Sequence, residues 1–309
     1  LRSPYVSDIL MIMTDSDTDD EAAIEPGDGA PLDRGEPVSL MEPMRISESS
    51  RHRGELNDLA VELAAHSAGF RRSLPAGVLT ALADLVRAMN CYYSNLIEGH
   101  DTHPVDIERA LKNDYSANAE KRNLQIEAKA HIAVQKWIDE GGLSGRTVSA
   151  DGICEIHGRF CERLPDELLW VEDTDNDERM EVVPGALRER DVKVGQHIAV
   201  SPGALPRFFQ QFERTYGSLG KAETIIAAAA AHHRLLWIHP FLDGNGRVAR
   251  LMSHSMLLEV LDTGGIWSIA RGLARSVRSY KSHLAQCDVP RRNDLDGRGN
   301  LSEEALAAF

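Results

Sequence analysis

The sequence predicts a mainly α-helical bundle that carries one small β-hairpin. Apolar residues recur at spacings of three and four along most of residues 75–290, which is the period of a helix with one buried face. Residues 180–200 differ, because valines and isoleucines there flank the turn-forming pair Pro184-Gly185 and favour strands. We therefore expect residues 75–309 to form one helical domain with the hairpin attached to it.

Length, charge and cysteine usage limit the classes of protein. The 309 residues are 42% hydrophobic, which is enough for a core, and the net charge of −14 argues against a nucleic-acid partner. Four cysteines lie without Cys-x-x-Cys pairing, which indicates buried thiols in a reducing compartment. Because no apolar run is long enough for a membrane span and no signal peptide is recognisable, we expect a cytoplasmic, bacterial protein without a membrane partner.

The first part of the chain has a different composition. Residues 1–50 contain twelve acidic and three basic residues, are rich in Ser, Pro, Asp and Gly, and show no apolar period. This composition predicts a disordered acidic tail. Residues 51–74 are expected to be a linker with a short helix over 55–68.

The helical pattern becomes stronger after Pro75. A helix is predicted over residues 77–99, where Gly99 suits the left-handed position that follows a helix. Between the later helices, residues 165–178 are expected to be an acidic loop and residues 181–202 the hairpin. The later helices are predicted over residues 105–112, 117–140, 150–163, 205–216, 221–236, 248–261, 273–287 and from 301 onward.

The most informative stretch is residues 239–250, which reads His-Pro-Phe-Leu-Asp-Gly-Asn-Gly-Arg-Val-Ala-Arg. It lies between two helical patterns, so it is predicted to be a loop that leads into a helix N-terminus, where free N–H groups and the helix dipole bind anions. Gly244 and Gly246 allow a left-handed backbone and a close approach to a phosphate. The stretch lacks the lysine of a P-loop, and no hydrophobic strand precedes it.

Each polar residue of this stretch also has a purely structural explanation. His239 is either a base or a structural histidine, and Asp243 is either a Mg²⁺ ligand beside phosphate oxygens or a turn residue. Asn245 either donates its amide to a phosphoryl oxygen or tolerates a left-handed backbone. Arg247 and Arg250 share one side of the opening helical turn, where they either bind a polyphosphate or form a solvated basic face. The combination favours a site that binds a polyphosphate and moves a proton.

At every defined position, residues 239–250 resemble the signature of Fic-domain proteins, His-Pro-Phe-x-(Asp/Glu)-Gly-Asn-Gly-Arg-x-x-Arg. Residues 184–202 look like the flap of that family. Residues 271–275, followed by Tyr280, look like the helix that comes after the signature. The resemblance covers roughly residues 75–309 and implies a Fic-type helical bundle with a β-hairpin flap at about 181–202.

The resemblance also implies an activity, namely a Fic/DOC-family adenylyltransferase that transfers AMP from ATP to a Ser, Thr or Tyr hydroxyl of a target protein. His239 would be the general base, Asp243 the Mg²⁺ ligand, and Phe241 the anchor of the loop. The target would dock at the flap by strand addition. The residues that would bind the nucleotide are Gly244, Asn245, Gly246, Arg247 and Arg250, with Tyr280 as either an adenine-pocket residue or a core tyrosine.

A second, shorter pattern precedes the signature. Residues 94–99 read Ser-Asn-Leu-Ile-Glu-Gly and resemble the inhibitory motif that some Fic-domain proteins carry on an N-terminal helix. Ser94 and Glu98 would then be the inhibitory residues. Glu98 would pair with Arg250 in place of the γ-phosphate, so that ATP binds only in a pose unfit for attack. The alternative is a surface glutamate at the end of a capped helix.

Several alternatives stay open. In a deAMPylase, Glu98 would orient a hydrolytic water, and a non-catalytic regulatory protein would use the same fold without the chemistry. Some relatives transfer UMP or other phosphorylated groups, and the sequence does not define the base pocket. Family members often dimerise, so a homodimer is an open option. His232 and His233, together with His239, suggest a metal site, but structural histidines are the preferred interpretation.

Overall fold

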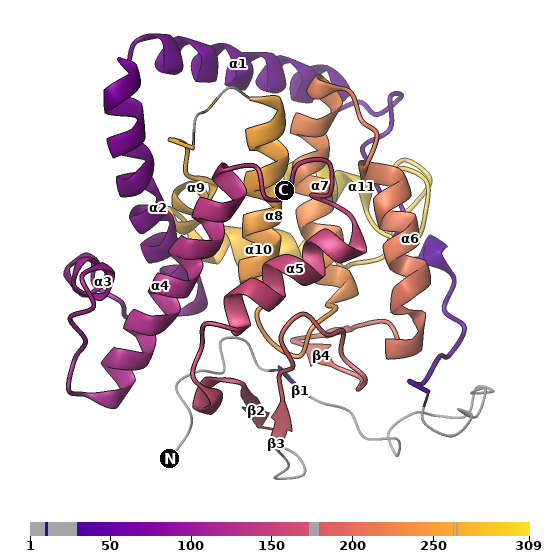
Figure 1. Ribbon diagram of the computed structural model, residues 1–309. Helices are drawn as coiled ribbons and strands as arrows, with labels where there is room; N and C mark the ends of the chain where they lie inside the picture. The colour runs from indigo at the N-terminus through magenta and orange to yellow at the C-terminus, as the bar shows by residue number, and fades with distance from the viewer. Residues whose placement is uncertain (1–9, 12–29, 173–178, 262, 264) are drawn as a thin grey trace.

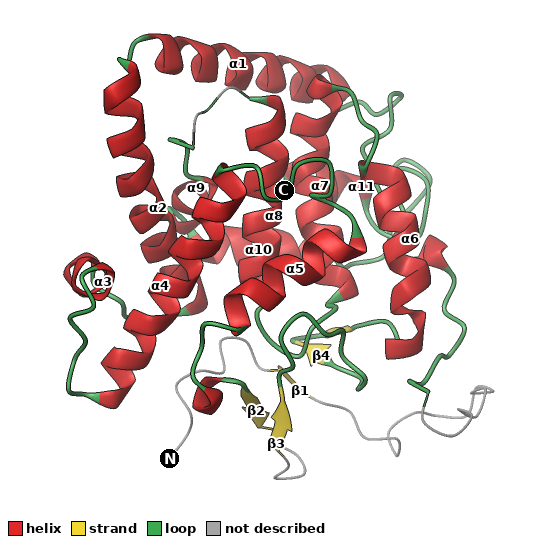
Figure 2. Ribbon diagram, viewed as in Figure 1, coloured by secondary structure: helices red, strands yellow, loops and turns green. Residues whose placement is uncertain are grey.

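The computed structural model describes residues 10–11, 30–172, 179–261, 263 and 265–309 (Figure 1). Within these ranges helices dominate and strands are confined to small antiparallel sheets, so the mainly α-helical class is confirmed (Figure 2). The short 3-10 helices are η1 (Val38–Met41), η2 (Asp166–Leu168) and η3 (Pro202–Ala204). The α-helices are α1 (Arg53–Arg72), α2 (Ala76–Glu98), α3 (Pro104–Leu111), α4 (Ala119–Asp139), α5 (Ala150–Cys161), α6 (Leu205–Tyr216), α7 (Lys221–Ile238), α8 (Asn245–Val260), α9 (Ile269–Ala274), α10 (Val277–Cys287) and α11 (Glu303–Ala308).

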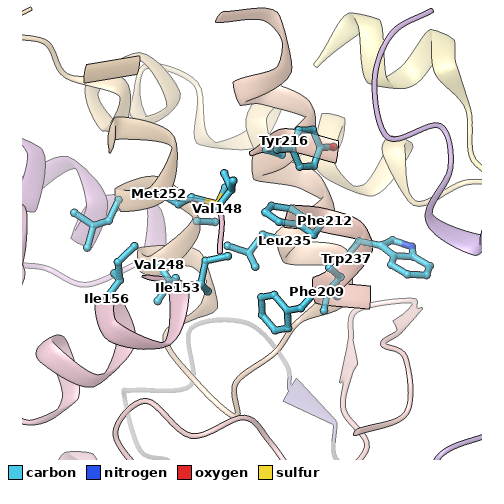
Figure 3. Close-up of a cluster of buried hydrophobic side chains, with 14 of the residues drawn as sticks. Val148, Ile153, Ile156, Phe209, Phe212, Tyr216, Leu235, Trp237, Val248 and Met252 are labelled. Atoms are coloured by element: carbon cyan, nitrogen blue, oxygen red, sulfur yellow. The ribbon is translucent and has the colours of Figure 1, made fainter. Parts of the chain in front are cut away.

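Helices α7 and α8 form the centre of the bundle and pack against each other (Figure 1). The alanine-rich sequence of α7 lets a neighbouring helix approach closely, while its larger residues enter the main core. Leu235 of α7 is fully buried between side chains of α6 and α8, including Phe212 and Met252 (Figure 3). This packing fixes the two helices whose junction carries the signature.

Helix α2 lies to one side of this centre and packs on α4 and α9. A separate, small apolar cluster beneath it joins Cys91 to Ile107 of α3 and to Ala128 and Ile132 of α4. Gly99 ends the helix in the left-handed region, with φ of 84°. Glu98 is therefore the last residue of α2, at the helix end that faces α8.

The strands form two small sheets at one end of the bundle (Figure 1). In the first, β2 (Trp170–Glu172) pairs with β3 (Arg179–Glu181). In the second, β4 (Lys193–Val194) pairs with β5 (His197–Ile198) on one edge and with β1 (Leu10–Met11) on the other. The hairpin of β4 and β5 lies inside the range expected for the flap.

Three details of the predicted secondary structure are wrong. The expected acidic loop over 165–178 instead contributes η2 and β2. The flap turns at Gly195, where φ of 63° suits a tight hairpin, and not at Pro184-Gly185. The single helix expected over 273–287 is interrupted, because the side chain of Ser276 caps a new helix, α10.

The expectation of a disordered tail to residue 50 is wrong for residues 30–50. Met41 is completely buried in the main core. Arg34 donates two hydrogen bonds to the carboxylate of Asp191, at 2.5 and 2.9 Å, and Glu36 accepts one from the backbone of Ser201 at 2.8 Å. Apart from residues 10 and 11, the tail before residue 30 lies outside the described residues.

Two other expectations concern the environment of the chain. Cys91, Cys161 and Cys287 are buried free thiols, and Cys154 is a half-buried one. Among the described helices, none is both long and apolar enough to span a membrane.

The segment before α1 should contribute to stability as a part of the core. Met41→Ala is expected to lower the free energy of unfolding by about 2–5 kcal/mol, because it leaves a cavity among buried side chains. Leu59→Ala, at a position on α1 that is 53% exposed, is the matched control and should change it by less than about 0.5 kcal/mol. Urea denaturation of the full chain measures both values. Equal values for the two variants would contradict a core role for this segment.

Candidate active site

The signature loop begins with an unusual backbone conformation. His239 follows the last turn of α7 in the left-handed region, with φ of 48° and ψ of 64°. A residue other than glycine occupies this region at a cost in free energy, so its surroundings must hold it there. Gly244, with φ of 79°, then leads into α8. Both residues line one cavity.

Phe241 anchors the loop in the core, as the resemblance implied. Its ring is completely buried and stacks on the ring of His157 from α5, with centroids 4.0 Å apart and planes 4° apart. The backbone N–H of Gly185 donates to Nδ1 of His157 at 2.9 Å. His157 thus connects the signature loop to the segment that leads into β4. Nothing in the sequence distinguishes this histidine from an ordinary core residue.

The side chain of Asn245 is occupied within the loop. It accepts from the N–H of Phe241 at 3.0 Å and donates to the carbonyl of the same residue at 2.8 Å. One of its two N–H donors is therefore used within the loop, and a bond from the amide to a phosphoryl oxygen stays a prediction. The first helical bond of α8 runs from the N–H of Val248 to the carbonyl of Gly244, so the N–H groups of the three residues between them point out of the helix end.

Three parts of the chain line the cavity at this helix end. The floor is the signature, from His239 and Asp243 to the start of α8. Tyr280 and Lys281 of α10 line one side. The hairpin of β2 and β3, which the sequence did not predict, contributes Trp170, with the guanidinium of Arg179 lying 5.3 Å from the centre of its ring.

Glu98 reaches from α2 into the N-terminal end of α8. Its carboxylate forms an ion pair with Arg250, and Nε of Arg250 donates to the hydroxyl of Ser94 at 2.9 Å. A Cβ atom on Gly246 would lie 2.6 Å from a carboxylate oxygen of Glu98, so the carboxylate needs a glycine at this position. The pairing that the resemblance implied is present.

Electrostatics keeps this carboxylate charged. Burial by itself raises the pKa of Glu98, but the positive charges of Arg250 and Arg247 outweigh burial and lower the pKa to about 2. Glu98 is therefore an anion at neutral pH. It lies beside the two arginines and the N-terminal end of α8, which favour anions. A surface glutamate at a capped helix end, the alternative considered for this residue, is excluded by its burial.

Arg247 has a partner that the sequence did not reveal. It forms an ion pair with Glu127 of α4, and Nδ1 of His100 lies 3.3 Å from the same carboxylate. Burial by itself raises the pKa of Glu127, but the charge of Arg247 and the contact with His100 together outweigh burial and lower it. Arg247 and Arg250 are only 5% and 4% exposed, which excludes a solvated basic face. Glu127 looks like any other helical glutamate in the sequence.

His239 and Asp243 have pKa values shifted in opposite directions. Burial, followed by the positive charge of Arg188, lowers the pKa of His239 to about 3, so the imidazole is neutral at pH 7. Burial raises the pKa of Asp243, which Arg247 partly opposes. Among the described residues, no cation forms an ion pair with the Asp243 carboxylate. This carboxylate is therefore suited to a bound cation beside phosphates.

His232 and His233 both have hydrogen-bond partners inside the fold. His232 lies 2.7 Å from the hydroxyl of Tyr280 and 2.9 Å from that of Ser253. His233 lies 3.0 Å from a carboxylate oxygen of Asp288. Within the part of the chain that the structure describes, no group of three or more His, Cys, Asp or Glu residues could hold a metal ion. The structural interpretation of His232 and His233 therefore holds.

Comparison with known proteins agrees with this geometry, because residues 147–257 match the Fic/DOC family. The chain contains a Fic domain. Over 169 residues it is 42% identical to the protein adenylyltransferase Fic of Drosophila erecta and to that of Drosophila melanogaster. These matches cover 54% of this chain and 31% of each relative. The matched region thus spans about a third of the length of these curated relatives.

Solved structures show the same fold. A Fic family protein from Desulfovibrio desulfuricans superposes with a TM-score of 0.61 at 14% identity, over 85% of this chain and 74% of that one. A Fic domain-containing signaling protein from Bacteroides thetaiotaomicron gives 0.56 at 21% identity, over 80% and 85%. Fic-1 from C. elegans gives 0.53 at 20% identity, over 75% and 62%. The Fic-type helical bundle with its small flap is confirmed.

The low pKa of Glu98 should make its contribution to stability depend on pH. A carboxyl group whose pKa falls from 4.5 to about 2 on folding stabilises the fold above pH 4.5, and this contribution disappears as the pH falls toward 2. Wild type should exceed Glu98→Gln in free energy of unfolding by on the order of 3 kcal/mol at pH 7, and this difference should shrink below about pH 5. Urea denaturation at a series of pH values measures the difference. A difference that does not change between pH 7 and the acid limit of folding would contradict the assignment.

Proposed function

We propose that this protein is an autoinhibited adenylyltransferase that moves AMP from ATP to a Ser, Thr or Tyr hydroxyl of a target protein. One observation carries this proposal: the neutral imidazole of His239, the outward N–H groups of α8 and the pair of Glu98 with Arg250 line a single cavity. The relatives named protein adenylyltransferase support it, since they match the region that contains the signature.

The proposed reaction needs one proton transfer and one displacement at phosphorus. The target hydroxyl donates its proton to the imidazole of His239 while its oxygen attacks the α-phosphorus of ATP. The bond between that phosphorus and the bridging oxygen of the β-phosphate breaks, and pyrophosphate leaves. The N–H groups of Asn245, Gly246 and Arg247 stabilise the charge that develops on the phosphates.

Asp243 is the residue that would hold Mg²⁺. Its carboxylate lies at the cavity floor without a described cationic partner, and Mg²⁺ binds through one or two carboxylates together with phosphate oxygens. Bound Mg²⁺ would neutralise negative charge on the phosphates. The chain itself supplies one carboxylate, so the nucleotide and water would supply the other ligands.

Autoinhibition follows from the competition between two anions. The carboxylate of Glu98 occupies Arg250, which would otherwise bind the γ-phosphate, and it lies against the backbone of Gly246. A triphosphate in the same place would meet both a steric obstacle and a like charge. Activation therefore requires that the end of α2 moves away from α8.

The flap is the proposed place for the target. Val194 of β4 and His197 of β5 line the cavity that holds His239. Strand β1 pairs with the edge of β4 that β5 does not occupy. This pairing shows that the edge can accept an added strand, which supports strand addition by the target. An extended target segment on this hairpin would present its hydroxyl to the imidazole.

Removing the inhibitory carboxylate should activate the protein. Glu98→Gly, incubated with Mg²⁺ and ATP labelled at the α-phosphate, is expected to label itself or target proteins roughly 5- to 150-fold more than wild type, the range that a coupling of about 1–3 kcal/mol gives. Asp101→Gly, an exposed acidic position close to Glu98, is the matched control and should behave like wild type. Adding His239→Ala to Glu98→Gly should abolish labelling.

Two results would lead to a different conclusion. If Glu98→Gly labels neither itself nor any protein in a lysate of the native host, the transferase proposal fails. Release of AMP from a modified target by wild type, lost in Glu98→Gly, would instead support a deAMPylase in which the ionised Glu98 orients water. The position of Glu98 in the cavity of His239 makes this the second candidate.

The metal ligand can be tested separately. In the Glu98→Gly protein, Asp243→Asn is expected to lower labelling by at least roughly 100-fold, since metal stabilisation of phosphate charge contributes several kcal/mol. EDTA should have the same effect, and excess Mg²⁺ should reverse EDTA but not the substitution. Asp294→Asn, at an exposed aspartate, is the matched control. Full labelling by Asp243→Asn in Mg²⁺ would exclude Asp243 as the ligand.

A further inference from the structure

Arg188 is a buried arginine without a carboxylate partner among the described residues. It precedes β4, is 3% exposed, and its guanidinium lies among backbone carbonyl groups. Nε donates to the carbonyl of His239 at 2.7 Å, and Nη2 donates to those of Ile238, at 3.4 Å, and Val200. Nη1 donates to the carbonyl of Arg190 at 2.8 Å. Four carbonyls thus surround one cation.

Burying a guanidinium in this way costs free energy. Burial lowers the pKa of Arg188 to about 10, although the group stays charged at neutral pH. An apolar residue would fill the same space without this cost. The hydrogen bonds must therefore serve a geometry that apolar packing does not specify.

Some of the hydrogen bonds of Arg188 go to the turn at His239. The left-handed conformation ends α7, so the carbonyls at residues 238 and 239 have no helical partner. The guanidinium of Arg188 donates a hydrogen bond to each of these two carbonyls. Its backbone N–H donates to the carbonyl of Pro240 at 2.9 Å. Three consecutive carbonyls of the turn are therefore bound by a single residue.

The other hydrogen bonds of the guanidinium go to the flap. The carbonyl of Arg190 lies just before β4, and that of Val200 lies just after β5. The guanidinium therefore joins both ends of the hairpin to the turn that carries the imidazole. A displacement of either flap end would change the hydrogen bonds that hold His239.

We propose that Arg188 is a positioning residue that holds His239 in its left-handed turn and fixes the imidazole relative to the flap. This inference rests on the proposed function, because the imidazole is taken as the base and the flap as the place where the target docks. The target would contact the imidazole of His239 and the flap at the same time, and the side chain of Arg188 fixes the position of both. Arg188 itself is not among the residues that line the cavity.

Arg188 also contributes to the charge around the imidazole. The groups that face His239 are Arg188, His197 of β5, Asp288 at the end of α10, and the carbonyl of Leu236. After burial, Arg188 is the main group that keeps the pKa of His239 low. A variant that removes this charge should raise that pKa, which loss of packing alone would not do.

Two substitutions separate geometry from charge. In the Glu98→Gly protein, Arg188→Gln is expected to lower kcat roughly 100-fold through misplacement of the base, with KM for ATP changed less than about twofold. The acid limb of its pH profile should move up by about one pH unit. Arg188→Lys keeps the charge but cannot reach four carbonyls, so it should lose kcat without moving the acid limb. Arg190→Gln, which removes an exposed charge two residues away, is the matched control.

Two measurements on the otherwise wild-type full chain do not need activity. NMR titration of the His239 ring should show a pKa raised by Arg188→Gln and unchanged by Arg190→Gln. Hydrogen exchange of residues 191–200 should become faster in Arg188→Gln, because the flap loses two of its anchoring hydrogen bonds. Absence of labelling by Glu98→Gly would therefore count against the transferase, while these two measurements still decide the role of Arg188.

The proposal is overturned if a folded Arg188→Gln matches Arg190→Gln in the pKa of His239 and in flap exchange. Should Arg188→Gln fail to fold by circular dichroism, Arg188→Lys decides the question. Full kcat in Arg188→Lys would then overturn the proposal, and a selective loss of kcat at unchanged KM would support it.

Discussion

A buried ion pair between Glu98 and Arg250 joins α2 to the N-terminal end of α8. Such a pair gives little net stability, because desolvation of both charges offsets their attraction, but removal of one partner leaves a buried charge unpaired. The buried charge of Arg250 therefore needs an anion beside it, and the carboxylate of Glu98 is that anion when no nucleotide is bound. A triphosphate is the other anion that could do so. In the proposed mechanism the two occupants exclude each other, so the position of α2 and the binding of ATP would be linked.

The remaining contacts of α2 fit a helix that can change its position. Its apolar cluster around Cys91 is small, and much of the buried surface that it shares with α4 and α8 is polar, including the ion pair of Arg87 with Asp139 at 2.6 Å. Water can replace polar contacts more readily than it can cover apolar side chains. In contrast, α7 and α8 share the main apolar core, which also contains Phe241 of the signature. The helix that carries Glu98 and the signature loop thus rest on contacts of different character, partly polar for the helix and mainly apolar for the loop.

The sequence predicted features that repeat or that depend on neighbours in the chain. The helical period located α7 and α8, and Gly99 marked the end of α2, so Glu98 was placed correctly at a helix end. The partners that lie far away in the chain were missed, because Glu127 and Arg188 acquire their roles only when separate elements meet. Residues 30–50 were missed for a related reason. Apart from the single turn of η1 they are irregular, so their buried side chains follow no period that a sequence pattern could reveal.

The charges around His239 bear on how the site is controlled. With a pKa of about 3, the imidazole is deprotonated throughout the physiological range, so protonation does not switch the site off. Such an imidazole is also a weak base, since general bases work best with a pKa near the working pH. Burial and the cation of Arg188 cause the low value, and a bound triphosphate would add negative charge close by and raise it. In the proposed mechanism, nucleotide binding would then strengthen the base in the same step that displaces Glu98, and control of the chemistry would lie in the anion site.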